Sequence, residues 1–140
     1  MQVKDVMTDK PEYLEASATI REAAMRMQEH NRGFTAIGER EKLVGVVTDR
    51  DIALRGIGKG KTPDDPISSV MSGKVLYCYQ DDEVTSVLQN MQDQGVQRLA
   101  VLNNDKNKDF VGVVALSDIA EKCKDTDLAQ RIANCCRTYH

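Results

Sequence analysis

Apolar residues recur at helical spacing in two stretches of the chain. In both stretches they fall at i, i+3, i+4 and i+7: Ile20, Ala23, Ala24 and Met27 in the first, Val84, Val87, Leu88 and Met91 in the second. That spacing places four apolar side chains on one face of an amphipathic helix. Thr19, followed three residues later by Glu22, forms the capping-box pattern of a helix start. The pattern predicts two helices that each bury one face.

Each predicted helix is followed by two short apolar runs rich in β-branched residues. The runs are residues 35–37, 43–47, 99–102 and 110–114. Runs of this kind, joined by polar connections, are typical of a β-hairpin with one face against a core. A short first strand and a short last helix complete each unit, near residues 12–15 and 49–56, then 75–79 and 117–122. The sequence predicts an α+β fold in which strand, helix, strand, strand, helix occurs twice.

The motifs themselves are duplicated. Val6-Met7-Thr8 and the run 45–52, GVVTDRDI, return as Val70-Met71-Ser72 and the run 112–119, GVVALSDI. Aligning the methionines gives an offset of 71 − 7 = 64, and aligning the glycines gives 112 − 45 = 67. The second copy therefore has about three extra residues, most simply in the polar run 103–109. We predict a pseudo-twofold module with a cleft between its halves, made of repeats 1–60 and 61–124.

Two further segments lie outside these patterns. Residues 56–66 are dense in glycine and proline, which predicts a flexible linker between the repeats. The tail 125–140 carries Leu128, Ile132 and Cys135 or Cys136 at helical spacing. A terminal amphipathic helix is expected there, packed on the chain's own module or on a second copy.

Composition narrows the classes of partner. The 140 residues carry a net charge of 19 − 22 = −3, which gives little overall attraction for nucleic acid or an anionic membrane surface. The first five residues lack the apolar run of a signal peptide, and no stretch approaches the roughly 20 apolar residues of a membrane span. We expect a soluble, cytoplasmic protein with no nucleic-acid and no membrane partner.

The cysteines and histidines offer no catalytic or metal constellation. Cysteines stand at 78, 123, 135 and 136 without a CxxC pair, which favours reduced structural thiols and no metal site. His30 and His140 have no partner at a telling spacing, and no nucleophile-elbow or zinc-protease motif occurs. The run 58–62, GKGKT, resembles the end of a phosphate-binding loop, but Arg55 stands where that loop needs glycine. We expect no catalysis and no catalytic cofactor.

The sharpest candidate site is the run Thr48-Asp49-Arg50-Asp51, where a strand leads into a helix. Backbone N–H groups at a helix start are unpaired and suit a phosphate, which the Thr48 hydroxyl can also contact. Asp51 could accept both hydroxyls of a ribose. The alternative is that Thr48 only caps the helix and Asp51 only favours its dipole. Asp118 occupies the same place in the second copy.

Together these residues resemble a tandem pair of CBS domains, named from the regulatory region of cystathionine β-synthase. The resemblance rests on the duplicated Val-Met-Thr/Ser and Gly-Val-Val runs with Gln97-Arg98-Leu99-Ala100-Val101, and covers roughly residues 3–122. It is closest to small bacterial proteins that consist of the pair alone. The family likeness implies a disk-shaped module, often a homodimer, that senses AMP, ATP, NAD or S-adenosylmethionine.

The same likeness implies two non-equivalent ligand sites, each drawing on both repeats. One site would use Thr48, Asp51, Ser72, Val75, Leu76 and Tyr77, with Arg98 facing a phosphate. The other would use Asp118 with Thr8, Pro11, Glu12, Arg32, Gly33 and Phe34. In each site the aspartate would hold the ribose, while backbone of the other repeat would flank the adenine.

Departures from the family pattern rank these sites. Ala115 stands where the family often has a hydroxyl residue, although Ser117 is close by, and Ala36 and Ala100 replace a usual proline. Loss of a charge-assisted phosphate contact weakens binding by roughly 1.5 to 3 kcal/mol. We therefore expect the Asp51 site to bind more strongly than the Asp118 site, with Arg32 as a candidate compensation.

Three functions follow as hypotheses. The first is a non-catalytic regulatory module in which an adenosine-containing ligand changes the arrangement of the halves or of two chains, and so signals to an unknown effector protein. The second is a homodimerisation or protein-interaction module with vestigial clefts. The third, an enzyme, has only the glycine-lysine run in its favour. Substitution of Asp51 or Asp118 separates the first two.

Overall fold

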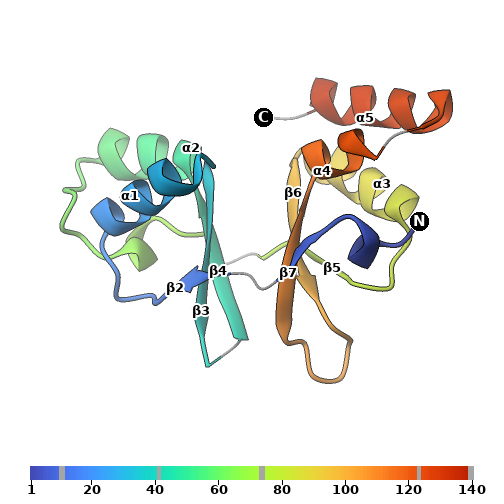
Figure 1. The fold of residues 1–140 in the computed structure, drawn as a ribbon. Coiled ribbons are helices and arrows are strands. Elements are labelled where there is room, and N and C mark those ends of the chain that lie inside the picture. The colour runs from blue at the N-terminus through green and yellow to red at the C-terminus, as the bar shows by residue number, and fades with distance from the viewer. Residues whose placement is uncertain (10–11, 41, 73–74, 123, 139–140) are drawn as a thin grey trace. The chain divides into compact units, whose positions relative to one another are not determined.

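The computed structural model describes residues 1–9, 12–40, 42–72, 75–122 and 124–138. The chain forms two compact units. Unit 1 joins residues 1–11 to residues 76–140, and unit 2 is residues 12–75. Each unit has its own sheet, helices and hydrophobic core, which confirms the α+β prediction (Figure 1).

Unit 2 is built on a three-stranded sheet in the order β2-β3-β4. β2 pairs in parallel with β3, and β3 forms an antiparallel hairpin with β4. The elements are β2 (Tyr13–Leu14), α1 (Ile20–His30), β3 (Phe34–Glu39), β4 (Lys42–Thr48) and α2 (Asp49–Asp51). The helix beginning at α2 continues as a π-helix over Ile52–Gly56 and a 3-10 turn over Ile57–Lys59.

Unit 1 contains a four-stranded sheet in the order β1-β7-β6-β5. Here β5 is parallel to β6, while β7 is antiparallel to both β6 and β1. The strands are β1 (Thr8–Asp9), β5 (Tyr77–Tyr79), β6 (Arg98–Leu102) and β7 (Phe110–Ala115). The helices are α3 (Val84–Gln94), α4 (Leu116–Glu121) and α5 (Thr126–Thr138).

The two predicted amphipathic helices begin where expected. Thr19 Oγ1 accepts from the Glu22 N–H at 3.1 Å, and a Glu22 carboxylate oxygen accepts from the Thr19 N–H at 3.4 Å, which completes the predicted capping box. One position of the predicted stripe departs from expectation. Ala24 of α1 is exposed, whereas Leu88, its counterpart at offset 64 in α3, is only 1% exposed.

The difference between these positions arises from α5. This helix packs against α3 and α4 (Figure 1). Its own Leu128 and Cys135 side chains are buried. The Cys135 thiol lies 3.2 Å from the Leu88 carbonyl oxygen and donates to it. The expected amphipathic helix of the tail is thus present over Thr126–Thr138 and packs on its own unit. No helix in the described ranges is both long and apolar enough to cross a bilayer.

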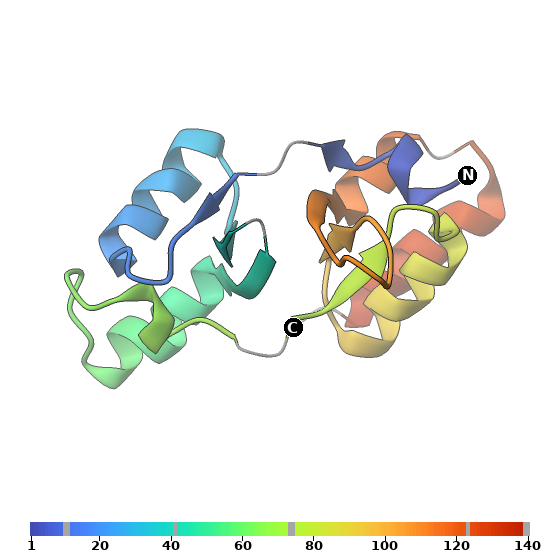
Figure 2. The ribbon, with the colours of Figure 1, turned by 90° about the horizontal axis from the view of Figure 1, so that it is seen from below.

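Two short segments complete the sheets and are called straps below: the N-terminal strap (residues 3–9) and the middle strap (residues 67–72). Each begins with a 3-10 turn whose apolar residues are buried. The N-terminal strap, dark blue in Figure 2, pairs Thr8 with Val113 of β7, and the middle strap pairs Ser72 with Val46 of β4. Each strap therefore packs on the hairpin of the other sequence repeat, and the compact units do not coincide with the repeats 1–60 and 61–124.

A glycine allows each strap to approach its hairpin. A Cβ on Gly112 would lie 2.7 Å from the Thr8 carbonyl oxygen and 2.8 Å from the Met7 sulfur. A Cβ on Gly45 would lie 2.7 Å from the Met71 sulfur and 3.1 Å from the Ser72 carbonyl oxygen. The repeated glycine of the sequence motif thus has a packing role in both units.

The predicted linker, residues 56–66, is instead an ordered part of unit 2. The Ile20 and Arg21 N–H groups donate to the Asp65 and Pro63 carbonyl oxygens, both at 3.0 Å. These bonds satisfy amides at the start of α1 that have no partner within the helix. A glycine- and proline-rich run is ordered here because the first turn of α1 needs its carbonyl groups.

Candidate functional site

The candidate motif lies at the β4–α2 junction, with Thr48 as the N-cap of the helix. The Thr48 N–H donates to Asp51 Oδ2 at 2.9 Å, and Thr48 Oγ1 accepts from the Asp51 N–H at 3.2 Å. This reciprocal pair is a capping box with aspartate in place of the usual glutamate. It fixes the Asp51 carboxylate while leaving its side chain 23% exposed.

The first amides of this helix are already partnered. The Asp49 N–H donates to the Gly33 carbonyl oxygen at 3.0 Å, the Arg50 N–H to Asp49 Oδ1 at 2.9 Å, and the Asp51 N–H to the Thr48 hydroxyl. The expectation of unpaired amides for a phosphate is therefore not met at this junction, because side chains and a loop carbonyl satisfy them. Positive charge for a phosphate has to come from side chains.

Arg55 is a second partner of Asp51. Its Nη2 lies 3.2 Å from Asp51 Oδ1 and also donates to the Val70 carbonyl oxygen at 2.6 Å. In the sequence, Arg55 stands out only as a mismatch to a phosphate-binding loop. The four-residue spacing to Asp51 is a signal for an ion pair, but the contact with Val70, 15 positions away, has no local sequence signal.

Gly33 and Phe34 frame the same junction from β3. A Cβ on Gly33 would overlap the Asp49 carboxylate, so the glycine admits that side chain against the backbone. Phe34 is paired with Thr48 in the β3–β4 register. Ser72 approaches from the middle strap, where its N–H donates to the Val46 carbonyl oxygen at 2.9 Å. Unit 2 thus holds Thr48, Asp51 and Ser72 around one end of its hairpin.

The β7–α4 junction of unit 1 has the same backbone arrangement. Asp118 Oδ2 accepts from the Ala115 N–H at 2.9 Å, and the Leu116 N–H donates to the Gln97 carbonyl oxygen at 2.8 Å. Ala115 supplies no hydroxyl to the Asp118 N–H, as the sequence indicates, and Ser117 is exposed. No ion pair to Asp118 occurs among the residues that the structure describes.

Three other predicted site residues of unit 1, Thr8, Tyr77 and Arg98, lie on its sheet, and Leu76 directly precedes β5. Arg98 pairs with Ala115 in the β6–β7 register, beside the Asp118 junction. Tyr77 pairs with Ala100, and the Leu76 carbonyl oxygen accepts from the Ala100 N–H at 3.3 Å. Thr8 lies on the opposite edge strand, β1.

The remaining predicted residues divide between the units. Glu12 of unit 2 is engaged by Arg26 at 2.7 Å and His30 at 3.5 Å, while the Arg32 side chain is exposed. Val75 is half-buried at the end of unit 2, and Pro11 lies outside the described residues. Each predicted site combines residues of both units, so its assembly stays a prediction.

Burial raises the pKa of two cysteine thiols, Cys78 and Cys135. Burial, with a smaller contribution from Asp82, raises the pKa of Cys78 to about 12. Burial also raises the pKa of Cys135, with Cys136 adding to the effect. Thiols of this kind are poor nucleophiles at neutral pH. Cys136 is exposed, and Cys123 and His140 lie outside the described residues.

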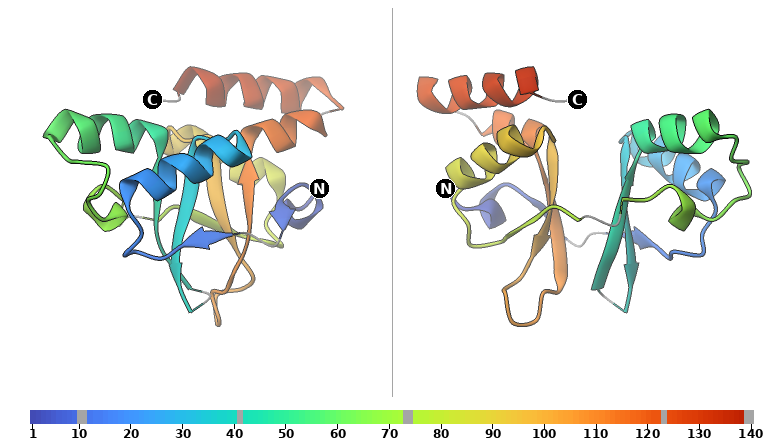
Figure 3. Two further views of the ribbon diagram at one scale, coloured as in Figure 1. Left: turned by 60° about the vertical axis from the view of Figure 1, so that its left-hand side comes forward. Right: turned by 180° about the vertical axis from the view of Figure 1, so that it is seen from behind.

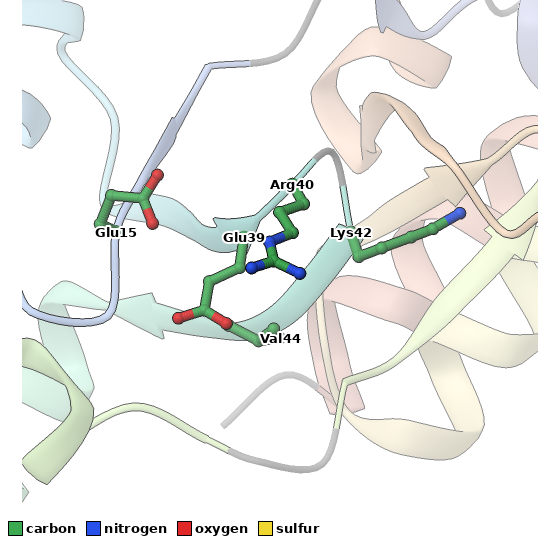
Figure 4. Close-up of a pocket in the computed structure, with 5 residues that line it drawn as sticks. All are labelled: Glu15, Glu39, Arg40, Lys42 and Val44. Carbon is green, nitrogen blue, oxygen red and sulfur yellow. The ribbon is translucent and has the colours of Figure 1, made fainter.

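A shallow depression of about 600 Å³ lies on unit 2 away from the motif, lined by Glu15, Glu39, Arg40, Lys42 and Val44 (Figure 4). It occupies the turn end of the β3–β4 hairpin, opposite the end that carries Thr48, and Figure 3 shows how far each hairpin extends. In Figure 4 the Lys42 side chain extends away from Glu39. Across the described ranges, no group of three or more His, Cys, Asp or Glu side chains is arranged to hold a metal ion.

The comparisons with known proteins decide the family. The CBS domain model matches the chain twice, at residues 3–57 and 67–125. The chain belongs to the CBS domain family. It is 37% identical over 118 residues to the CBS domain-containing protein YhcV of Bacillus subtilis, covering 84% of this chain and 82% of that protein. The duplicated motif is therefore a tandem CBS pair.

Solved CBS structures share the fold. A conserved CBS domain protein of unknown function from Thermoplasma acidophilum is similar with a TM-score of 0.84 and 25% identity, over 99% of this chain and 78% of that one. The CBS domain pair of protein MJ0100, in complex with 5′-methylthioadenosine and S-adenosyl-L-methionine, has a TM-score of 0.77 and 27% identity. That alignment covers 87% of this chain and 94% of that one.

Proposed function

We propose that this CBS pair is a non-catalytic regulatory module that binds an adenosine-containing ligand. The observation that carries the proposal is the fixed, partly exposed Asp51 carboxylate at the β4–α2 junction. Each of its oxygens keeps a lone pair beyond the bonds from Thr48 and Arg55, so ribose hydroxyls can donate to it. Support comes from the similar CBS pair of MJ0100, whose two ligands both contain adenosine.

The candidate ligands are AMP, ATP, NAD and S-adenosylmethionine. An aspartate that accepts from ribose hydroxyls suits all four ligands alike. Selectivity among them therefore depends on other residues, which contact the group attached to the 5′ carbon. Arg98, on β6 of unit 1, is the proposed phosphate partner in the Asp51 site. Because a charged contact of this kind contributes roughly 1.5 to 3 kcal/mol, the preference between AMP and S-adenosylmethionine reports directly on Arg98.

The test is calorimetric titration of the four candidates and 5′-methylthioadenosine into the wild type, Asp51→Asn and Asp118→Asn. Asparagine keeps a capping acceptor but loses the charge. Asp64→Asn is the matched control, because its side chain is 77% exposed and forms a surface ion pair with Arg21 at 3.3 Å. Asp51→Asn should weaken binding at least tenfold, Asp118→Asn less, and Asp64→Asn not at all.

A thermal shift provides the second readout. A ligand at about a hundred times its dissociation constant stabilises the fold by roughly 2.7 kcal/mol, which raises the melting temperature visibly. Failure of all five compounds to bind at millimolar concentration, with the protein folded, would reject the ligand-sensing proposal.

The second candidate function is a protein-interaction or homodimerisation module. It is favoured by three exposed apolar side chains on the helices of unit 2: Met25 at 53%, Leu54 at 53% and Ile57 at 63% exposed. Exposed apolar groups of this size mark interaction surfaces when they form one patch. Sedimentation equilibrium of the wild type and Leu54→Lys tests this candidate, since loss of self-association in the variant supports it.

A further inference from the structure

Arg55 connects two parts of unit 2 that carry proposed ligand residues. Asp51 lies at the start of the helix, and the middle strap carries Ser72. The Nη2 atom of Arg55 reaches both parts, at 3.2 Å from Asp51 Oδ1 and 2.6 Å from the Val70 carbonyl oxygen. A guanidinium Nη2 carries two hydrogens, so one atom can donate to both acceptors.

The two contacts complement the other bonds of these groups. The Thr48 N–H holds Asp51 Oδ2, so Arg55 at Oδ1 fixes the second oxygen of the same carboxylate. In the strap, the amides of Val70 and Met71 donate to the Ile67 carbonyl oxygen, and that of Ser72 donates to β4. The Val70 carbonyl is bound by a charged donor instead, a bond about twice as strong as a neutral one.

The helix geometry at Arg55 is unusual. Residues Ile52–Gly56 form a π-helix directly after Asp51, and Arg55 is its fourth residue. π-helical turns are rare and occur frequently at functional sites. The equivalent position in unit 1, at offset 67, is the exposed Lys122, for which no ion pair to Asp118 occurs among the described residues. The connection is therefore specific to the Asp51 junction.

We infer that Arg55 is a positioning residue that couples ligand occupancy of Asp51 to the middle strap. The inference rests on the proposed function, because the ligand is the one proposed to bind Asp51. A ribose that binds the carboxylate acts on the guanidinium, and the guanidinium holds the carbonyl two residues before Ser72. The strap and the carboxylate then respond to the ligand as one element.

The first experiment needs no ligand. Residue-resolved amide hydrogen exchange is compared in the wild type, Arg55→Met and Lys59→Met. Lys59 is the matched control, because it is an exposed cation four residues further along with the same change of charge. The Met71 and Ser72 amides should exchange about tenfold faster in Arg55→Met alone, while the Val6 and Met7 amides of the N-terminal strap serve as the internal reference. Unchanged strap exchange overturns the inference.

The second experiment measures binding of S-adenosylmethionine and AMP by calorimetry. Arg55→Met should weaken binding about tenfold, and Arg55→Lys should recover part of the loss. Because Arg55 acts through Asp51, the double variant Arg55→Met with Asp51→Asn should bind no worse than Asp51→Asn alone. Additive losses, or tighter binding by Arg55→Met, would overturn the positioning role.

The two experiments separate the inference from the proposed function. If none of the five titrated compounds binds the wild type, the ligand proposal and the coupling to occupancy both fail. Hydrogen exchange still decides whether Arg55 holds the strap.

Discussion

The two strand-to-helix junctions share one backbone arrangement and differ in the side chains placed on it. In both, an aspartate at the third helical position accepts from the N-cap N–H at 2.9 Å. The unit 2 junction adds the Thr48 hydroxyl and the Arg55 ion pair, whereas unit 1 has Ala115 at the N-cap. The repeat thus supplies the position of the carboxylate twice, but a fully held carboxylate only once.

The outer faces of the helices are better covered in unit 1 than in unit 2, whereas the aspartate is better held in unit 2. In unit 1, α5 covers α3 and α4 and buries Leu88. In unit 2, the equivalent Ala24 is exposed, together with the larger Met25 and Leu54. Unit 1 has the more fully covered helices, whereas unit 2 has the aspartate with more side-chain partners. Stabilising and binding features are therefore concentrated in different units.

Leu88→Ala should produce the largest effect, because it removes buried contacts beneath α5. Truncating a fully buried leucine costs about 2 to 5 kcal/mol of unfolding free energy. Met25→Ala, at the position after Ala24 on the uncovered helix, should change stability by less than about 0.5 kcal/mol. Urea unfolding of both variants measures the difference. Similar losses would mean that the face of α1 is covered in solution.

Gly112→Ala should have the next largest effect and lower the unfolding free energy by about 2 to 3 kcal/mol, because its Cβ would meet a backbone carbonyl in the N-terminal strap. Gly45→Ala should cost less, since the nearest atom belongs to the flexible Met71 side chain. Thermal unfolding of the two variants compares the straps directly. A larger loss for Gly45→Ala would show that the middle strap is the more rigid one.

Cys78 should make the stability of unit 1 sensitive to alkaline pH. Unit 2 has the non-titrating Leu14 at the equivalent position, at offset 64. The Cys78 pKa of about 12 in the fold lies above the ordinary value of 9, so its contribution to stability is complete below pH 9 and is lost between pH 9 and 12. From pH 8 to 10 the loss is about 1 to 2 kcal/mol. The pH dependence of unfolding free energy in Cys78→Ala, subtracted from that of the wild type, isolates it. An identical dependence in both proteins would contradict the prediction.

Exchanging the N-caps should give the smallest effect. Thr48→Ala removes the hydroxyl that accepts from the Asp51 N–H and should cost about 1 kcal/mol. Ala115→Thr supplies a hydroxyl that can accept from the Asp118 N–H and should raise the unfolding free energy by up to about 1 kcal/mol. Melting temperatures of the two variants should therefore shift in opposite directions. A destabilising Ala115→Thr would mean that the partly closed N-cap of α4 has no room for the longer side chain.

The local elements were predictable because they depend on local patterns. The periodicity of α1 and α3 and the capping box at Thr19 need only neighbouring residues, and the structure places both helices and the capping box as expected, with Ala24 as the one exposed position of the stripe. The duplicated Gly-Val-Val runs likewise marked β4 and β7. The family followed from the same duplication.

The unpredicted features depend on contacts between distant residues. The exchange of straps joins residue 8 to residue 113, which no local period can indicate. Residues 56–66 have the composition of a linker, yet their carbonyl groups satisfy the start of α1. The Arg55 contact with Val70 depends on where the π-helix brings the guanidinium. The sequence indicated Thr48 and Asp51 as candidates but not Arg55, the residue that links Asp51 to the middle strap.

The strap exchange also determines how the chain can be divided. The backbone passes between the units twice, at residues 11–12 and again at residues 75–76. A single proteolytic cut at either crossing leaves the units joined through the other. A gene fragment that encodes one repeat, by contrast, yields a strap without its sheet and a sheet without its strap. The duplicated halves are therefore inseparable as folding units, although each is recognisable as a sequence.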